Sequence, residues 1–179
     1  IEKGGEIIPK VVGVQLKNRD IFSKPVEYIR FCPACNTELM RKEGDAKHYC
    51  SNNRGCFPQI RGGFEHFISR KAMNIDGLGA ETIELLIKKG LIREVSDLFF
   101  LNRDELLNLD RMAEKSVDNL LLAIKKSKDV PFHRILFGLG IRYVGETVAK
   151  VLARHFKTID AITDASFEDL VNVDEIGEK

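Results

Sequence analysis

Cys32-Pro33-Ala34-Cys35 opens the segment that decides how this chain is organised, and Cys50 and Cys56 close it after a loop of fourteen residues. These four cysteines are the only ones in the sequence of 179 residues. Two cysteines separated by two residues lie on a tight turn that directs both thiolates to one point, as a tetrahedral zinc ion requires. The loop is long enough to form a hairpin that returns the second pair to the same ion. The spacing predicts a structural zinc site with four thiolate ligands.

Other interpretations of these cysteines remain open at this point. The thiols could form two disulfides or lie free in a core, and His48 could replace one ligand. A module of about 25–30 residues buries too little apolar surface to fold alone, whereas structural zinc contributes about 10–16 kcal/mol of apparent binding free energy. With four cysteines available, no coordination position stays open, so the predicted zinc is structural and not catalytic.

Composition and charge narrow the functional class. An apolar share of 44% with 31% charged residues is ordinary for a globular protein. No run approaches the ~18 apolar residues of a transmembrane helix, so we expect no membrane contact. Residues 24–71 carry nine Lys and Arg against five Asp and Glu, residues 72–157 fourteen against twelve, and residues 158–179 one against seven. A nucleic-acid surface is therefore expected in the first two ranges.

Residues 1–25 are predicted to contain the end of a β domain and a linker. The segment Glu6–Leu16 is rich in β-branched residues, and Pro9 restricts it to an edge strand or a bent strand. One or two strands are not stable alone, so we expect the rest of that domain to lie outside this sequence. Residues 26–62 are the predicted zinc module.

Residues 63–179 are predicted to be helical. Gly62-Gly63 is expected to break the chain before a helix on which Phe64, Phe67, Ile68 and Ala72 recur at helical spacing. A five-residue pattern with apolar first and fourth residues then occurs four times, at Ile75–Gly79, Leu109–Ala113, Ile141–Gly145 and Val173–Gly177. The last residues of these copies are 34, 32 and 32 residues apart, which indicates an internal repeat.

The spacing also fixes the register of the repeat. Gly138-Leu139-Gly140 resembles a turn, but using it would make the intervals 27 and 37, so we place it at the end of a helix. In the regular register, the fourth and seventh residues after each of the first three copies are apolar and share a helical face: Ile83, Val117 and Ala149, then Leu86, Leu120 and Leu152. Asp104–Asp110 resembles Glu168–Asp174, which groups the copies into two pairs, each expected to pack about a pseudo-twofold axis. The fourth copy is truncated, because its second helix would follow Lys179.

Each copy predicts a helix, a tight turn and a second helix, which is an arrangement that binds phosphate. The backbone N–H groups of the turn and of the next helix N-terminus are expected to be unpaired and to point outward, where the helix dipole favours an anion. Such contacts bind DNA without reading its bases. The alternative is that the turns are only corners between helices. The predicted DNA-binding residues are Gly77, Leu78, Gly79, Thr82, Arg111, Met112, Ala113, Lys115, Arg142, Tyr143, Val144, Gly145 and Thr147.

Two copies depart from the pattern. Arg111 and Ala113 replace the glycines of the second, and a positive φ at Ala113 would cost about 1–2 kcal/mol. We therefore expect that turn to be distorted or to use the Arg111 side chain. The fourth copy carries Asp174 and Glu175 and is not expected to bind phosphate.

Over its whole length the sequence resembles the middle-to-C-terminal part of bacterial NAD-dependent DNA ligases. Gly4–Pro9 is similar to the end of that family's OB-fold, Cys32–Cys35 and Cys56–Gln59 to its zinc finger, and His66–Gly79 and Leu139–Thr147 to its first and third helix-hairpin-helix motifs. The resemblance implies a mainly α fold, with four tandem helix-hairpin-helix motifs in two paired units after a four-cysteine zinc module and a β tail of an OB-fold.

The resemblance also implies an enzyme that seals nicks in duplex DNA during replication and repair, through an adenylated lysine, with NAD⁺ and Mg²⁺. We expect NAD⁺ and Mg²⁺ to bind outside this segment, because the family's catalytic Lys-x-Asp-Gly motif does not occur in the sequence. The segment alone is expected to bind Zn²⁺ and to clamp DNA without catalysing a reaction. The implied partners are nicked double-stranded DNA and the ligase's own adenylation and OB domains, in a monomer associated with the bacterial nucleoid in the cytoplasm.

Two other functions are compatible with parts of the sequence. One is a non-catalytic helix-hairpin-helix scaffold that recruits DNA-repair enzymes. The other is a glycosylase, which would need a base-flipping pocket and a catalytic Asp or Lys after one hairpin. Asp160 and Asp164 follow the third copy, but they lie in an acidic stretch that is better interpreted as a solvated face.

Overall fold

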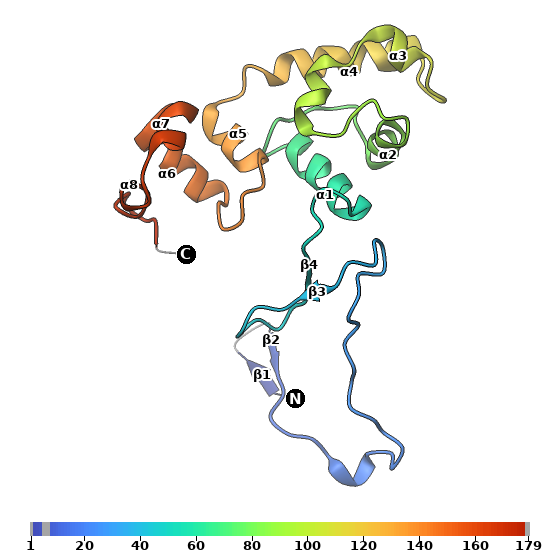
Figure 1. The fold of residues 1–179 in the computed structure, drawn as a ribbon, viewed down its shortest axis with the longest axis vertical. Helices are drawn as coiled ribbons and strands as arrows, with labels where there is room; N and C mark the ends of the chain where they lie inside the picture. Colours follow the sequence, from blue (N-terminus) through green and yellow to red (C-terminus); the bar gives the residue numbers. More distant parts are fainter. Residues whose placement is uncertain (1, 5–7, 178–179) are drawn as a thin grey trace.

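The computed structural model of this chain describes residues 2–4 and 8–177 (Figure 1). Strand β1 (Glu2–Gly4) pairs antiparallel with β2 (Ile8–Lys10), with Lys3 opposite Pro9. The predicted strand is therefore shorter than expected and ends at Lys10, while the turn and the start of the predicted segment, residues 5–7, lie outside the described residues. Residues 11–30 contain only the 3-10 turn η1 (Leu16–Asn18), and all of their side chains are exposed.

The zinc module is built on a short hairpin. Strand β3 (Leu39–Met40) pairs antiparallel with β4 (Tyr49–Cys50), and Leu39 lies opposite Cys50. An isolated bridge between Phe31 and Glu38 extends the pairing toward the first cysteine pair. The loop between the two cysteine pairs thus folds back as the sequence predicts.

Helix α1 (Phe57–Ile68) corrects the expectation that Gly62-Gly63 breaks the chain. The helix begins directly after Cys56 and runs through both glycines, whose surroundings are open enough to admit a Cβ without contact. Each glycine costs about 0.5–1 kcal/mol in a helix, but the opposite face buries Phe64, Phe67 and Ile68, and that burial outweighs the cost. Ala72 is fully buried, although it lies after the end of the helix.

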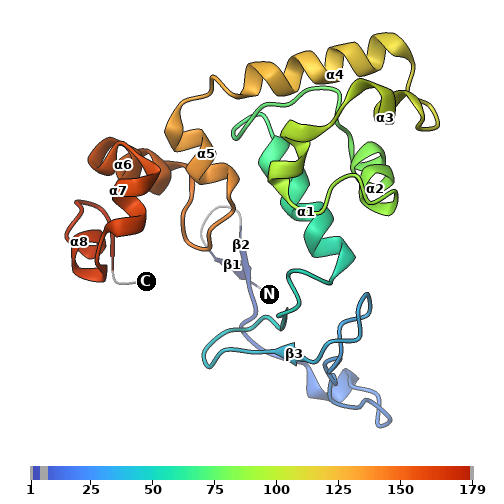
Figure 2. The ribbon, with the colours of Figure 1, turned by 45° about the horizontal axis from the view of Figure 1, so that its top comes forward.

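The remaining helices form two groups (Figure 2). The first group packs α1 with α2 (Ala80–Lys88), η2 (Val95–Phe100), α3 (Arg103–Leu107) and α4 (Glu114–Ser127) around one core. The second group consists of α5 (Phe132–Gly138), α6 (Glu146–Phe156), α7 (Ile159–Asp164) and α8 (Phe167–Val171) around a smaller core. None of the helices in the described residues is long and apolar enough to span a bilayer.

The two groups repeat the same plan. In each, two helices enclose the first turn, a short helical segment follows, and a five-residue helix leads into the second turn. The five-residue helices start alike, because Asn102 and Ser166 each accept a hydrogen bond from the backbone N–H three residues later. The predicted core positions are confirmed: Ile83, Leu86, Val117, Leu120, Ala149 and Leu152 are all buried.

The groups meet where α1 contacts α5. The Nε2 atom of His66 lies 2.7 Å from the carbonyl oxygen of Phe137, and the two rings pack edge to face. The Arg134 guanidinium donates to the carbonyl oxygens of Arg70 and Lys71. Lys71 Nζ in turn lies 3.0 Å from a carboxylate oxygen of Glu146, the first residue of α6. These contacts join the end of α1 to the second group at several points.

Candidate metal centre and phosphate-binding turns

The four cysteines converge on one point. Their Sγ atoms all lie within 4.8 Å of one another, with 3.9 Å between Cys32 and Cys56 and 3.5 Å between Cys35 and Cys50. Tetrahedral zinc with Zn–S bonds of about 2.3 Å separates its sulfur ligands by about 3.8 Å, so the arrangement fits a bound zinc ion. Disulfide sulfurs would be about 2.05 Å apart, and all four cysteines are free. The donor set and its geometry confirm the predicted four-cysteine site.

The hydrogen bonds around the thiols favour ionisation at Cys35. The hydroxyl and the backbone N–H of Thr37 lower the pKa of Cys35 to about 6, since both stabilise the thiolate. At Cys50 the backbone N–H of Asn52 lowers the pKa, but burial and the other thiols outweigh it and raise the pKa to about 11. Burial also raises the pKa of Cys56. Among the ligands, Cys35 is therefore the thiol whose ionised form its surroundings favour most.

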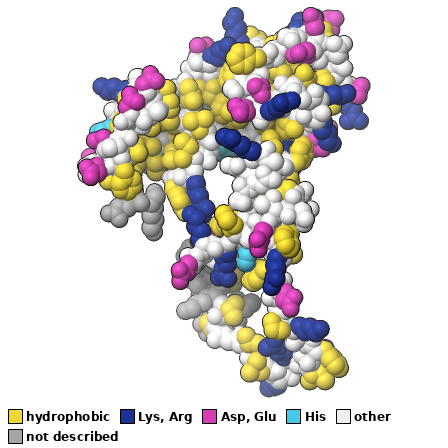
Figure 3. Space-filling model, in the orientation of Figure 1, with side chains coloured by type: hydrophobic (Ala, Val, Ile, Leu, Met, Phe, Trp, Pro, Cys, Tyr) yellow, Lys and Arg dark blue, Asp and Glu magenta, His cyan; other side chains and the backbone are white. Residues whose placement is uncertain are grey.

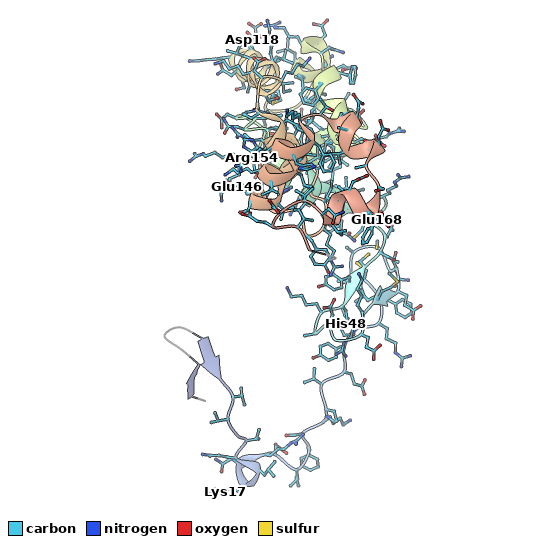
Figure 4. The ribbon with its side chains drawn as sticks, turned by 90° about the vertical axis from the view of Figure 1, so that its left-hand side faces the viewer. Lys17, His48, Asp118, Glu146, Arg154 and Glu168 are labelled. Carbon is cyan, nitrogen blue, oxygen red and sulfur yellow. The ribbon has the colours of Figure 1, made fainter. Side chains whose placement is uncertain are left out.

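His48 is not a member of the ligand cluster found among the described residues. Its ring stacks on Tyr28, with 4.9 Å between the ring centroids. Figure 4 places it on the side of the zinc module that faces the N-terminal linker. The alternative in which His48 replaces a cysteine is not supported.

All four predicted turns share one backbone feature. The third residue of each five-residue copy has a left-handed conformation, with φ of 84° at Gly77, 66° at Arg111, 70° at Tyr143 and 68° at Glu175. The shared conformation confirms the register with intervals of 34, 32 and 32 residues and places Gly138 at the end of α5, as predicted.

The last residue of each of the first three turns is extended and not left-handed. Gly79, Ala113 and Gly145 have φ of −85°, −79° and −76°, and each is the residue immediately before the second helix. Ala113 therefore does not need a positive φ and carries no such cost, because alanine adopts this conformation freely. The strained residue of the second turn is Arg111 instead.

A further left-handed residue distinguishes alternate turns. Asn74 and Gly140 have φ of 53° and 65°, each three residues before the left-handed residue of its own turn. The equivalent residues of the second and fourth turns, Asn108 and Asn172, are helical instead, with φ of −78° in both. The first turn thus matches the third in backbone conformation, and the second matches the fourth. The similarity of Asp104–Asp110 to Glu168–Asp174 indicates the same correspondence between the two groups.

The turns also pair in space. A hollow lined by Glu81, Thr82, Asp110, Arg111 and Met112 lies between α2, the helix that follows the first turn, and the second turn. An equivalent hollow at the third and fourth turns is lined by Tyr143, Val144, Glu175, Ile176 and Gly177 among others. The second turn thus lies beside the helix that follows the first turn, while the third and fourth turns border one hollow.

Apolar side chains anchor the turns as predicted. Leu78 is buried in the first core and Met112 packs against it, while Val144 and Ile176 pack against the second core. The N–H groups of Met112, Val144 and Ile176 donate to the carbonyl oxygen of the first residue of their own turn, at 3.0–3.3 Å. The expectation that these N–H groups are unpaired is therefore wrong. The N–H groups of Gly79, Ala113 and Gly145 have no hydrogen-bond partner among the described residues, so these groups are available to an anion.

The predicted side chains have different surroundings. Thr82 is half-buried, and Lys115, Thr147 and Gly145 are exposed. Arg111 is exposed and lies 3.8 Å from the carboxylate of Glu81. Arg142 is engaged with the zinc module, since its guanidinium lies 3.7 Å from Asp45.

Three residues near these sites had no signal in the sequence. Thr37 interacts with Cys35 at 3.2 Å, but a threonine two residues after a cysteine is common in proteins of any kind. Lys71 and Lys150 both pair with Glu146 at the start of α6, and together they lower the pKa of that carboxyl to about 2. Lys71 comes from the first group, so only the folded chain brings it to the third turn.

The surface charge follows the division found in the sequence. Lys and Arg side chains lie over the zinc module and beside the opening between the module and the helices, whereas Asp and Glu gather over the end formed by α7 and α8 (Figure 3). The fourth turn belongs to this acidic end, and both Asp174 and Glu175 are exposed.

Comparison with protein families gives three matches. Residues 31–56 match the NAD-dependent DNA ligase C4 zinc finger domain, residues 69–126 a SAM-like helix-hairpin-helix tandem, and residues 134–179 a helix-hairpin-helix motif.

Similar proteins extend the match to the whole chain. The chain is 59% identical over all of its 179 residues to a DNA ligase of Christiangramia forsetii, and 55% identical to DNA ligases of Phocaeicola vulgatus and Flavobacterium johnsoniae. It spans 27% of the length of each of these relatives.

Proposed function

Because the chain is a zinc-finger and helix-hairpin-helix segment of the bacterial NAD-dependent DNA ligase family, we propose that the protein it represents seals nicks in duplex DNA. The sealing chemistry, with NAD⁺, Mg²⁺ and an adenylated lysine, belongs to domains outside this segment. The segment itself binds the DNA and catalyses no reaction. We place the protein in the bacterial cytoplasm, with the nucleoid, as a monomer.

One observation supports the DNA-binding role most directly. Turns of the same backbone geometry are repeated at regular intervals, and in each of the first three an N–H group at the start of the following helix has no partner among the described residues. Helix N-termini bind phosphate through such groups. We propose that Gly77, Leu78, Gly79 and Thr82 form one contact region, that Arg111, Met112, Ala113 and Lys115 form a second, and that Tyr143, Val144, Gly145 and Thr147 form a third. Arg142, which the sequence predicts in the third region, is left out of it because its guanidinium is paired with Asp45. The fourth turn is acidic and stays off the DNA.

The division of labour along the chain follows from this proposal. Residues 1–25 are the end of an OB-fold and a linker, and their exposed apolar side chains are covered by the rest of that domain in the whole protein. Residues 26–62 are the zinc finger and residues 63–179 the helix-hairpin-helix domain. The two parts share α1, since residue 62 lies inside that helix.

Binding of the zinc-loaded chain to nicked and intact duplex DNA across a salt series tests the proposal. Each phosphate contact contributes about 0.9 to the slope of log K against log salt, so three occupied turns give a slope of about −2.7 or steeper. A slope near zero, or no binding at low salt, would contradict DNA binding by the isolated segment.

Substitutions at equivalent positions separate the turns. Gly79→Val and Gly145→Val each place a bulky side chain beside the N–H that faces the anion, and each should reduce the slope by about 0.9 for every phosphate that is no longer bound. A Cβ at either position meets no atom within 4 Å, so the helix content should not change. Gly177→Val is the matched control, because it occupies the same position in the acidic fourth turn. Slopes equal to that of the native chain for all three variants would mean that the turns are only corners between helices.

A further inference from the structure

Arg142 lies where the third turn meets the zinc module. It is the second residue of the copy Ile141–Gly145, directly before left-handed Tyr143. Its Nη2 atom lies 3.7 Å from Oδ2 of Asp45, and its guanidinium carbon lies 4.9 Å from the ring centroid of Tyr49 and 5.1 Å from that of Tyr143. One guanidinium thus contacts a carboxylate and two aromatic rings, and two of these three partners belong to the zinc module.

The partners of Arg142 are held firmly within the module. Asp45 ends a turn in which its N–H bonds to the carbonyl oxygen of Lys42 at 3.0 Å, and Gly44 supplies the positive φ of 82°. The Arg41 side chain donates to the carbonyl oxygen of Asp45 at 2.6 Å. Tyr49 precedes the zinc ligand Cys50 on β4. The module therefore holds the backbone of both partners in place, so that the carboxylate of Asp45 and the ring of Tyr49 lie beside the guanidinium.

This contact closes a ring of elements. The zinc module continues into α1 through Cys56, α1 contacts α5 through His66 and Phe137, and α5 leads to the third turn. Besides the contact of Arg142, the described residues join the module to the helical groups through α1, and Asn53 and Arg54 border the same hollow as Arg93–Val95 of the first group. Two attachments restrict rotation of the module much more than one, because a helix end alone leaves the module free to swing.

We propose that Arg142 is a positioning residue that holds the zinc module at a fixed angle to the second helical group. An arginine suits this role, because its planar guanidinium pairs with a carboxylate and stacks on aromatic rings at the same time. The side chain is still about half exposed, so the contact can be remade if it opens. This inference does not depend on the proposed DNA binding.

The orientation of the module can be measured without DNA, with Co²⁺ in place of Zn²⁺ in the four-cysteine site. Co²⁺ produces pseudocontact shifts in nearby amides, and these shifts depend on the angle between the metal centre and each helix. In the native chain we expect one set of shifts that fits α1 and α6 together. In Arg142→Gln, the module should swing about the start of α1 at Cys56, so the shifts of α1 beyond its first turn and those of residues 146–156 should both fall toward zero through averaging.

Matched variants make the test decisive. Arg154→Gln removes an arginine from α6, at the position labelled in Figure 4, and should leave all shifts unchanged. Asp45→Asn and Tyr49→Leu remove partners from the module side and should reproduce part of the loss. Native shifts at residues 146–156 in Arg142→Gln would overturn the proposal. So would a loss in Arg142→Gln with native shifts in both module variants, because Arg142 would then act only on the folding of its own turn.

Discussion

Thr37 sets the acidity of the metal centre through its contacts with Cys35. Its hydroxyl and backbone N–H lower the pKa of Cys35 from the ordinary 9.0 to about 6, which favours the thiolate. A thiolate binds zinc without first losing a proton, and partners behind the ligands commonly matter for metal affinity.

Thr37→Val should therefore weaken zinc binding by about tenfold, which is the lower end of what such partners contribute. Loss of the hydroxyl moves the pKa of Cys35 back toward its ordinary value, so protons compete better and zinc is released at a higher pH than in the native chain. Chelator competition followed across a pH series measures both effects. Thr37→Ser keeps the hydroxyl and should release zinc at the same pH as the native chain. If Thr37→Val also released zinc at the native pH, the hydroxyl would have no role in zinc binding.

Gly77 and Gly79 flank Leu78 in the first turn, but their backbones differ. Gly77 has φ of 84° and Gly79 has φ of −85°, and a Cβ at either position meets no atom within 4 Å. Gly77→Ala should lower the free energy of unfolding by about 1–2 kcal/mol, because an L-residue is strained in the left-handed region. Gly79→Ala should change it by less than about 0.5 kcal/mol. Denaturant unfolding compares the two, and similar losses for both would show that the left-handed conformation is not what the turn requires.

Gly62 and Gly63 make α1 less stable than it would be with alanine at these positions. Both have open space around them. Gly63→Ala should raise the free energy of unfolding by about 0.5–1 kcal/mol, because alanine loses less conformational freedom in a helix than glycine. Gly138→Ala is the contrasting variant, since its new Cβ would lie 3.2 Å from Ala72 and 3.3 Å from Phe67, and it should gain less or lose stability. A larger gain at Gly138 than at Gly63 in denaturant unfolding would contradict this account.

The elements also show what the sequence could and could not predict. The cysteine spacing and the intervals of the repeat were enough to predict the zinc site, the register of the turns and their core residues, because these depend on short-range periodicity. The path of α1 through Gly62-Gly63 was not predictable from local preference, since distant side chains decide it by burying Phe64 and Phe67. The contact of Arg142 with Asp45 joins residues far apart in the sequence, and a periodic sequence pattern cannot predict which distant residues meet in the fold.

At the scale of the molecule, the zinc module and the helical groups should respond differently to loss of the metal. Between residues 26 and 56, all of which the structure describes, the buried side chains are those of Cys32 and Cys56, whereas the first helical group buries a continuous apolar cluster. Removal of zinc by a chelator should therefore unfold residues 30–56 and leave α2 to α4 folded, because zinc contributes the main folding free energy of such small modules.

Amide hydrogen exchange before and after chelation locates this change. Protection should disappear in the module and in the first turn of α1, and it should persist at Val117 and Leu120. Cys32→Ser and Cys56→Ser should behave as the chelated chain does. Full zinc content in both serine variants would refute the metal assignment, and uniform loss of protection would mean that the chain folds as one unit.

Cys56 is both the last metal ligand and the residue that precedes α1, so a rotation of this helix changes the orientation of the metal centre relative to the helical array. A helix advances about 1.5 Å and turns about 100° per residue. One residue inserted at Gly62-Gly63 would thus turn the module about a quarter of a revolution out of phase with the third turn and carry Asp45 away from Arg142. The number of residues in α1 therefore determines the rotation of the zinc module relative to the third turn. It cannot change by one residue, although Gly62 and Gly63 have no side chain in contact with other parts of the chain.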